Sequence, residues 1–198
     1  MHEPRLTLAQ SEFILGGQKS GKSRRAETLA CDWLAQSSRH RAILIATAQP
    51  WDEEMRQRIA RHQSDRAARI PGMTTLEEPL ALAAKITELS RPDTLLVVDC
   101  LTLWLTNHLM PVTPEFKENK PLAPALPYQV DLLLEAISTA QGPLVLVGNE
   151  IGLGVIPLGA EVRAFVDALG TLNQNVAQVC QRVTLMAAGL ALTLKEMP

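Results

Sequence analysis

Long apolar runs, paired cysteines and an excess of one charge are all missing from this sequence of 198 residues. No stretch approaches the ~18 consecutive apolar residues that a membrane-spanning helix needs. The first dozen residues lack the basic start and apolar centre of a secretory signal. A formal net charge of −2 excludes a strongly basic nucleic-acid-binding protein. The composition therefore favours a globular protein whose partners are small molecules.

The three cysteines, Cys31, Cys100 and Cys180, lie far apart and are odd in number. Their spacing matches neither a zinc site nor a redox dithiol. We expect all three to be reduced residues that fill small spaces in the core, which points to the cytoplasm.

A share of 46% hydrophobic residues is enough for a sizeable core, and we expect one domain over residues 1–198. Residues 1–11 are predicted to form a flexible extension. Four short apolar runs are typical of buried parallel strands, namely Phe13–Leu15, Ala42–Ala46, Leu95–Val98 and Leu144–Val147. Helical spacing occurs in Lys22–Gln36, Asp52–Gln63, Pro79–Leu89, Leu101–Leu109, Gln129–Ala140 and Gly159–Gln181.

This alternation predicts an α/β fold in which helices flank a mostly parallel sheet. Val183–Met186 and Leu190–Leu194, separated by a short turn that contains Gly189, predict an antiparallel hairpin at one edge. Residues 110–127 contain five prolines and form a predicted surface loop. That loop is either a tolerated insertion or a lid or partner contact.

The strongest motif directly follows the first strand and has the pattern G-x-x-x-x-G-K-S. Glycines let consecutive backbone N–H groups point at a phosphate, and the helix that follows adds its positive dipole end. The lysine can reach the outer phosphates and the serine hydroxyl can bind Mg²⁺. The predicted nucleotide-binding loop consists of Gly16, Gly17, Gln18, Lys19, Ser20, Gly21, Lys22 and Ser23.

A carboxylate, Asp99, follows the apolar strand Leu95–Val98. In nucleotide-binding proteins of this kind an acidic residue at such a position holds Mg²⁺ opposite the serine of the loop, here Ser23. Asp99 is alternatively a helix cap for the helix near Thr102. The loop upstream favours the metal.

His62 lies where a predicted helix with several arginines meets a polar segment. Its imidazole is an exposed surface group, a proton shuttle or a nucleophile that attacks phosphorus. The residue types alone leave these three roles open.

Taken together, the motifs resemble those of the bifunctional adenosylcobinamide kinase and adenosylcobinamide-phosphate guanylyltransferase family of cobalamin biosynthesis. The resemblance covers Phe13 to Lys195. It is carried by GGQKSGKSRRAE at 16–27, IATAQPWDEEMRQRIARHQSDR at 45–66, EEP at 77–79, VDCLTLWLTN at 98–107, NEIGLGVIP at 149–157 and GTLNQ at 170–174.

The resemblance implies a RecA-like P-loop NTPase fold and a reaction in two halves. Adenosylcobinamide takes a phosphoryl group from ATP or GTP; GMP then passes from GTP through the histidine matching His62 to that phosphate. The phosphate-loop motif predicts Lys22 as a catalytic residue and Mg²⁺ at Ser23 and Asp99, and the resemblance implies a homotrimer. It further implies nucleotide contacts from Ala46, Thr47, Ala48, Gln63, Ser64, Asp65, Arg66, Glu77 and Asp99.

Some features depart from the family or stay open. Met73 stands where the family often has tryptophan, and residues 65–71 form a longer stretch, so the position of Glu77 depends on the alignment. Gly152–Gly154 is a loop that grips substrate or a simple turn. Two other functions remain possible: a P-loop kinase without guanylyltransferase activity, and a non-catalytic nucleotide-binding partner protein.

Overall fold

A mostly parallel sheet forms the centre of the computed structural model, which describes residues 7–50, 53–54, 56–57, 61, 68–110, 126–155 and 157–197. Its strand order is β3-β2-β4-β5-β1-β6-β7, and β6 and β7 form the antiparallel pair. The strands are β1 (Ser11–Gly16), β2 (Arg41–Ala46), β3 (Met73–Glu77), β4 (Thr94–Asp99), β5 (Leu144–Val147), β6 (Arg182–Ala187) and β7 (Leu190–Glu196).

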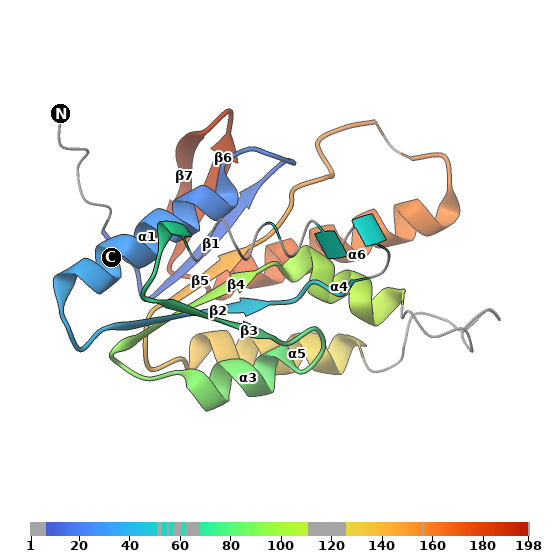
Figure 1. Cartoon of the computed structure of the whole chain (residues 1–198). Coiled ribbons are helices and arrows are strands. Elements are labelled where there is room, and N and C mark those ends of the chain that lie inside the picture. The colour runs from blue at the N-terminus through green and yellow to red at the C-terminus, as the bar shows by residue number, and fades with distance from the viewer. Residues whose placement is uncertain are drawn as a thin grey trace.

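Helices cover both faces of this sheet (Figure 1). The described helices are α1 (Lys22–Gln36), α3 (Leu82–Leu89), α4 (Leu101–Leu109), α5 (Leu126–Ser138) and α6 (Ala160–Val179). Successive residues of β4 alternate between two cores: Leu95 and Val97 pack with α1, whereas Leu96 and Val98 pack with the other helices. Burial on both faces explains why the central strands are continuous apolar runs.

The predicted fold class is confirmed, and so are α1, α4 and β5 with the bounds expected from the sequence. The predicted start of a helix at Pro79 is wrong. The Glu78 carboxylate accepts hydrogen bonds from the N–H groups of Leu80 and Ala81, at 3.1 and 2.7 Å, and α3 begins only at Leu82. These bonds satisfy backbone donors in a turn that precedes the helix.

Strand β3 was not expected from the sequence. It lies at the edge of the sheet and pairs with β2 alone. Its residues are partly or fully exposed, so it shows no apolar run that would mark it as a buried strand. Of the predicted helix 52–63, the structure describes Glu53, Glu54, Arg56, Gln57 and Arg61, all of which are helical.

The parallel strands bring the predicted site residues to one edge of the sheet. Ala46 at the end of β2 is in register with Glu77 of β3 and with Asp99 of β4. Gly16 ends β1, two strands away from β4. The carboxyl ends of parallel strands are where ligands bind in open α/β sheets.

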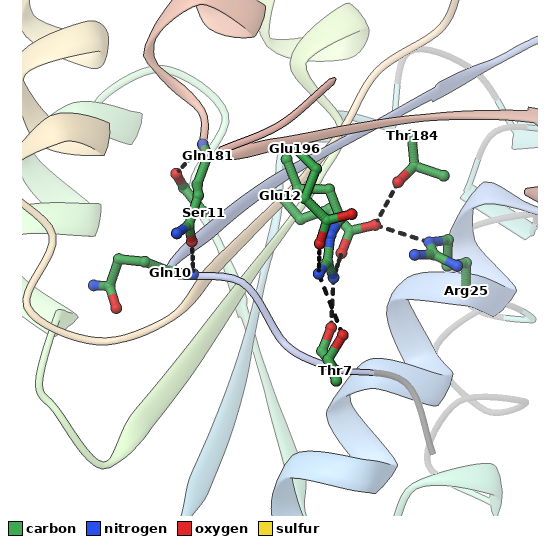
Figure 2. Close-up of polar contacts among 9 residues, drawn as sticks. Thr7, Gln10, Ser11, Glu12, Arg25, Gln181, Thr184 and Glu196 are labelled. Atoms are coloured by element: carbon green, nitrogen blue, oxygen red, sulfur yellow. Dashed lines mark hydrogen bonds and ion pairs between the residues drawn. The ribbon is translucent and has the colours of Figure 1, made fainter. Parts of the chain in front are cut away.

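A buried ionic network lies at the opposite end of β1 (Figure 2). Glu12 is fully buried, and its carboxylate accepts hydrogen bonds from Arg25 Nε at 2.8 Å, Thr184 Oγ1 at 2.8 Å and Arg182 Nη1 at 3.4 Å. Arg182 also donates to Glu196 Oε1 at 2.6 Å. A buried charge is tolerated only when it is paired in this way, so the network ties α1 and β6 to the strand that carries the phosphate loop.

Candidate functional site

Backbone geometry shapes the loop between β1 and α1. A Cβ atom on Gly16 would lie 2.4 Å from the carbonyl oxygen of Met186, so only glycine fits beside β6. Gly21 has a φ of 104°, a conformation that favours glycine, and it forms the N-cap of α1 without a side-chain hydrogen bond. The first N–H groups of α1 therefore have no capping side chain and face the loop, as an anion site requires.

Lys22 directs its ammonium group back into the loop. Nζ donates to the carbonyl oxygen of Gly17 at 2.6 Å, and the residue is buried. Burial lowers the pKa of Lys22, while Cys100 and the Asp99 carboxylate oppose that change. The position lets the ammonium contact a phosphate that the loop holds.

Ser23 and Asp99 lie next to each other. Ser23 Oγ donates to Asp99 Oδ2 at 3.2 Å. The N-cap of α4 is Cys100, with no side-chain capping bond, so the alternative role of Asp99 as a helix cap finds no support. A hydroxyl and a carboxylate are hard oxygen ligands, which suit Mg²⁺ together with water and phosphate oxygens. Among the described residues, no three His, Cys, Asp or Glu residues gather closely enough to hold a metal alone.

Thr47, in the middle of the predicted contact segment 46–48, forms its hydrogen bonds with other residues of the protein. Thr47 is fully buried; its hydroxyl donates to the carbonyl of Cys100 at 2.7 Å and accepts from the N–H of Cys100 at 2.9 Å. Asn107 Nδ2 donates to the Thr47 carbonyl at 2.8 Å. Thr47 therefore joins β2 to α4 through its side chain and backbone.

Side chains of α4 form hydrogen bonds with the backbone of the segment that follows Glu77. Asn107 Nδ2 also donates to the Pro79 carbonyl at 3.0 Å, and Trp104 Nε1 donates to the Leu80 carbonyl at 3.0 Å. Sequence reasoning missed both residues, although they belong to the quoted stretch at 98–107. An asparagine and a tryptophan inside an apolar helix are the signal that would have found them, because buried polar groups need partners.

The turn of the C-terminal hairpin lies against the phosphate loop. Ala188 and Gly189 have φ values of 51° and 80°, as a two-residue hairpin turn requires. The N–H of Gly189 donates to the carbonyl of Ser20 at 3.0 Å, and a Cβ on Gly21 would lie 3.3 Å from the Gly189 Cα. The hairpin was predicted, but this contact was not.

One loop beside the phosphate site is anchored at its base. In the connection between β5 and α6, the N–H of Asn149 donates to Thr102 Oγ1 at 2.8 Å, and its carbonyl accepts from Asn173 Nδ2 at 3.1 Å. The N–H of Glu150 donates to the carbonyl of Gly16 at 3.2 Å. This loop therefore starts one hydrogen bond away from the phosphate loop.

Some predicted residues fall outside the described part of the chain. They are His62, Gln63, Ser64, Asp65 and Arg66, together with residues 111–125 of the proline-rich segment. The residues that the structure does bring together at the edge of the sheet are the phosphate loop, Ala46, Thr47, Ala48, Glu77 and Asp99. Within the described part, no helix is long and apolar enough to cross a membrane.

The family model described as cobinamide kinase / cobinamide phosphate guanyltransferase matches residues 12–194. The chain is 46% identical to the bifunctional adenosylcobalamin biosynthesis protein CobP of Pseudomonas aeruginosa, over 94% of this chain and 98% of that protein. It is 32% identical to the bifunctional adenosylcobalamin biosynthesis protein CobU of Salmonella typhimurium, over 92% and 98%.

Among solved structures, the flagellar accessory protein FlaH of Methanocaldococcus jannaschii superposes with a TM-score of 0.51 at 12% identity, covering 96% of this chain and 80% of that one. At this identity the likeness concerns the fold alone.

Proposed function

Because this chain belongs to the cobinamide kinase and cobinamide phosphate guanyltransferase family, we propose that it carries out both reactions on adenosylcobinamide. ATP or GTP phosphorylates the acceptor hydroxyl, and GMP from GTP is then added to give adenosylcobinamide-GDP for adenosylcobalamin biosynthesis. The observation that carries this proposal is the phosphate loop, in which Lys22 points inward and Ser23 contacts Asp99. These parts serve any transfer from a bound triphosphate.

In the kinase half, the protein mainly positions the reactants and neutralises charge. The amides of the loop and of the α1 N-terminus hold the phosphates, and Lys22 stabilises the charge that develops on the transferred group. The acceptor oxygen attacks the γ-phosphorus while the bond to the nucleoside diphosphate breaks. Ser23 and Asp99 are the residues that would hold Mg²⁺, which neutralises phosphate charge when bound.

In the guanylyltransferase half, we assign the nucleophile to His62. A neutral ring nitrogen attacks the α-phosphorus of GTP, a P–N bond forms, and pyrophosphate leaves. An oxygen of the acceptor phosphate then attacks the same phosphorus, and the P–N bond breaks. Contacts to the guanylyl group are assigned to Gln63, Ser64, Asp65, Arg66 and Glu77. Support for this assignment comes from the family resemblance and from the place of Glu77 at the same sheet edge as the phosphate loop.

The proposal also includes the oligomeric state, the compartment and the class of ligand. We assign a homotrimer in the cytoplasm, with small molecules as ligands and without nucleic acid as a partner. Free cysteines at 31, 100 and 180 suit a reducing compartment. Three leucines at 190, 192 and 194 are exposed on the edge strand β7, where a second copy could cover them. Light scattering on the purified protein gives the subunit number.

The experiment that tests the function uses GTP labelled at the α-phosphate. The wild-type protein is expected to retain label that is stable in base and lost in acid, as a P–N bond is. The variant His62→Ala should lose this label but still phosphorylate adenosylcobinamide, because that step needs no enzyme nucleophile. A His2→Ala variant, which changes a histidine of the N-terminal segment, is the control and should label like the wild type.

Three results would contradict the proposal. Label retained by His62→Ala places the nucleophile elsewhere. Loss of phosphorylation together with labelling shows that His62 serves the shared triphosphate site or the fold. A wild-type protein that phosphorylates its acceptor but never takes up label would instead be a kinase without the second activity.

A further inference from the structure

The connection between β5 and α6 exposes apolar side chains to an unusual degree. Leu153, Val155 and Leu158 are 82%, 96% and 97% exposed, and Val162 in the first turn of α6 is half exposed. Exposed apolar residues that cluster in this way mark surfaces that bind a ligand or a partner. Figure 1 shows the connection, in orange, arching away from the sheet before it enters α6.

The base of this loop is rigidly placed beside the phosphate site. Asn149 is held on both sides by Thr102 and Asn173, and Glu150 donates from its backbone to Gly16. The Glu150 carboxylate accepts from the N–H of Gly152 at 2.7 Å, which sets the direction in which the chain leaves. The apolar tip therefore projects from a base that is one hydrogen bond from the loop that holds the triphosphate.

Two other described loops at this edge differ from this connection, because one is held by hydrogen bonds and the other is a short turn. Glu78, Trp104 and Asn107 close the segment between β3 and α3, where Leu80 keeps a partly exposed side chain. The Ala188–Gly189 turn packs on the phosphate loop. Leu80 and Leu190 are also exposed near this edge, but the three most exposed apolar side chains there, among the described residues, are Leu153, Val155 and Leu158 of the β5–α6 connection.

We propose that Leu153, Val155 and Leu158 bind the corrin macrocycle of the acceptor and so bring its hydroxyl to the phosphate loop. This assignment rests on the function proposed above, because it needs an acceptor that is large, flat and partly apolar. Such a ligand extends far beyond the phosphate loop, and its transfer reaction requires an apolar surface that adjoins the γ-phosphate. A loop anchored to Gly16 and apolar at its tip meets both requirements.

The test compares the double variant Leu153→Ser/Leu158→Ser with Leu153→Met/Leu158→Met, which keeps the loop apolar. The serine variant should raise KM for adenosylcobinamide by about tenfold or more, because each fully buried leucine contributes enough apolar contact for such a change. KM for GTP and labelling by α-phosphate-labelled GTP should stay at wild-type values. The methionine variant and Tyr128→Ser, which alters an exposed residue of α5, should behave as the wild type.

Several outcomes would overturn this assignment. An unchanged KM for adenosylcobinamide in the serine variant shows that the loop does not touch the acceptor. A changed subunit number by light scattering shows that the apolar tip is a contact between copies of the chain. A parallel loss of GMP labelling shows that the loop acts through the phosphate site. Failure of the function itself appears already in the wild type, as absent phosphorylation of adenosylcobinamide, and the loop assignment then falls with it.

Discussion

At the scale of single residues, most of the candidate chemistry depends on groups at the edge of the sheet that hold one another in place. Lys22 contacts the carbonyl of Gly17, Ser23 contacts Asp99, and Thr47 contacts the backbone of Cys100. Each of these contacts joins segments that are distant in sequence or turns the loop back on itself. Small changes here should therefore alter ligand binding before they alter the fold.

Lys22→Ala is expected to impair both reactions. Removing the ammonium takes away a charge contact that strengthens in the transition state, which typically costs on the order of 10² in kcat or more. Phosphorylation of adenosylcobinamide and the rate of GMP labelling are the two measurements. Lys85→Ala, a change of the same type at a lysine of α3 that pairs with Glu88 outside the phosphate loop, is the control and should keep both activities. Near-normal turnover of Lys22→Ala would contradict the role assigned to the phosphate loop.

The cysteines should differ in reactivity. Burial raises the pKa of Cys100 and of Cys180 to about 12, so both are neutral thiols at pH 8. Cys31 is exposed, so the expectation that it fills the core is wrong; partial burial, Asp32 and Glu27 raise its pKa. Because the thiolate is the reactive form, its fraction grows as pH rises toward the pKa. Iodoacetamide should alkylate Cys31 alone in the folded protein, faster at pH 9 than at pH 8.

Peptide mapping by mass spectrometry identifies the modified position, and the urea-unfolded protein, in which all three cysteines should react, is the control. Modification of Cys100 at the same rate as Cys31 in the folded protein would contradict the burial of the strand end next to Asp99.

At the scale of elements, sequence patterns predicted helices and strands that have local signals, and they missed an edge strand and contacts between segments that are distant in sequence. Helix α1 and strand β5 have the expected bounds because capping glycine and continuous apolar character are local signals. Strand β3 was missed because an edge strand is only half covered and lacks such a run. Asn107 inside an apolar helix signals a polar group that needs partners, but its hydrogen bonds to Thr47 and Pro79 join three separate segments, so the sequence could not identify those partners.

The β6–β7 hairpin is an element whose turn should influence nucleotide binding. Gly189→Val forces a β-branched residue into a left-handed conformation, which costs at least about 1 kcal/mol and displaces the turn from Ser20. KM for GTP should rise severalfold, with little change in secondary structure by circular dichroism. Leu190→Val, which places a similar side chain one residue later in a strand, should leave KM unchanged. Equal KM values for both variants would mean that the hairpin turn does not stabilise the phosphate loop.

At the scale of the whole molecule, the strand order separates neighbours in space from neighbours in sequence. Strand β1 lies between β5 and β6, so the strand that leads into the phosphate loop pairs with segments more than a hundred residues away. The same order sends the apolar β5–α6 connection out beside that loop. Of this arrangement, the sequence predicted the parallel class and the terminal hairpin, whereas the position of β1 within the sheet required the structure.

The contact of Gly189 with Ser20 has a consequence for biosynthesis on the ribosome. The phosphate loop is translated early, but its neighbours β6 and the hairpin turn are absent until residue 189 has emerged. The nascent chain therefore has no complete GTP-binding site, and GTP cannot stabilise it during folding. A fragment of residues 1–181 should therefore gain no thermal stability from GTP, whereas the full chain should gain it in proportion to the logarithm of the nucleotide concentration. Equal GTP-dependent shifts of Tm in both would show that the loop matures on its own.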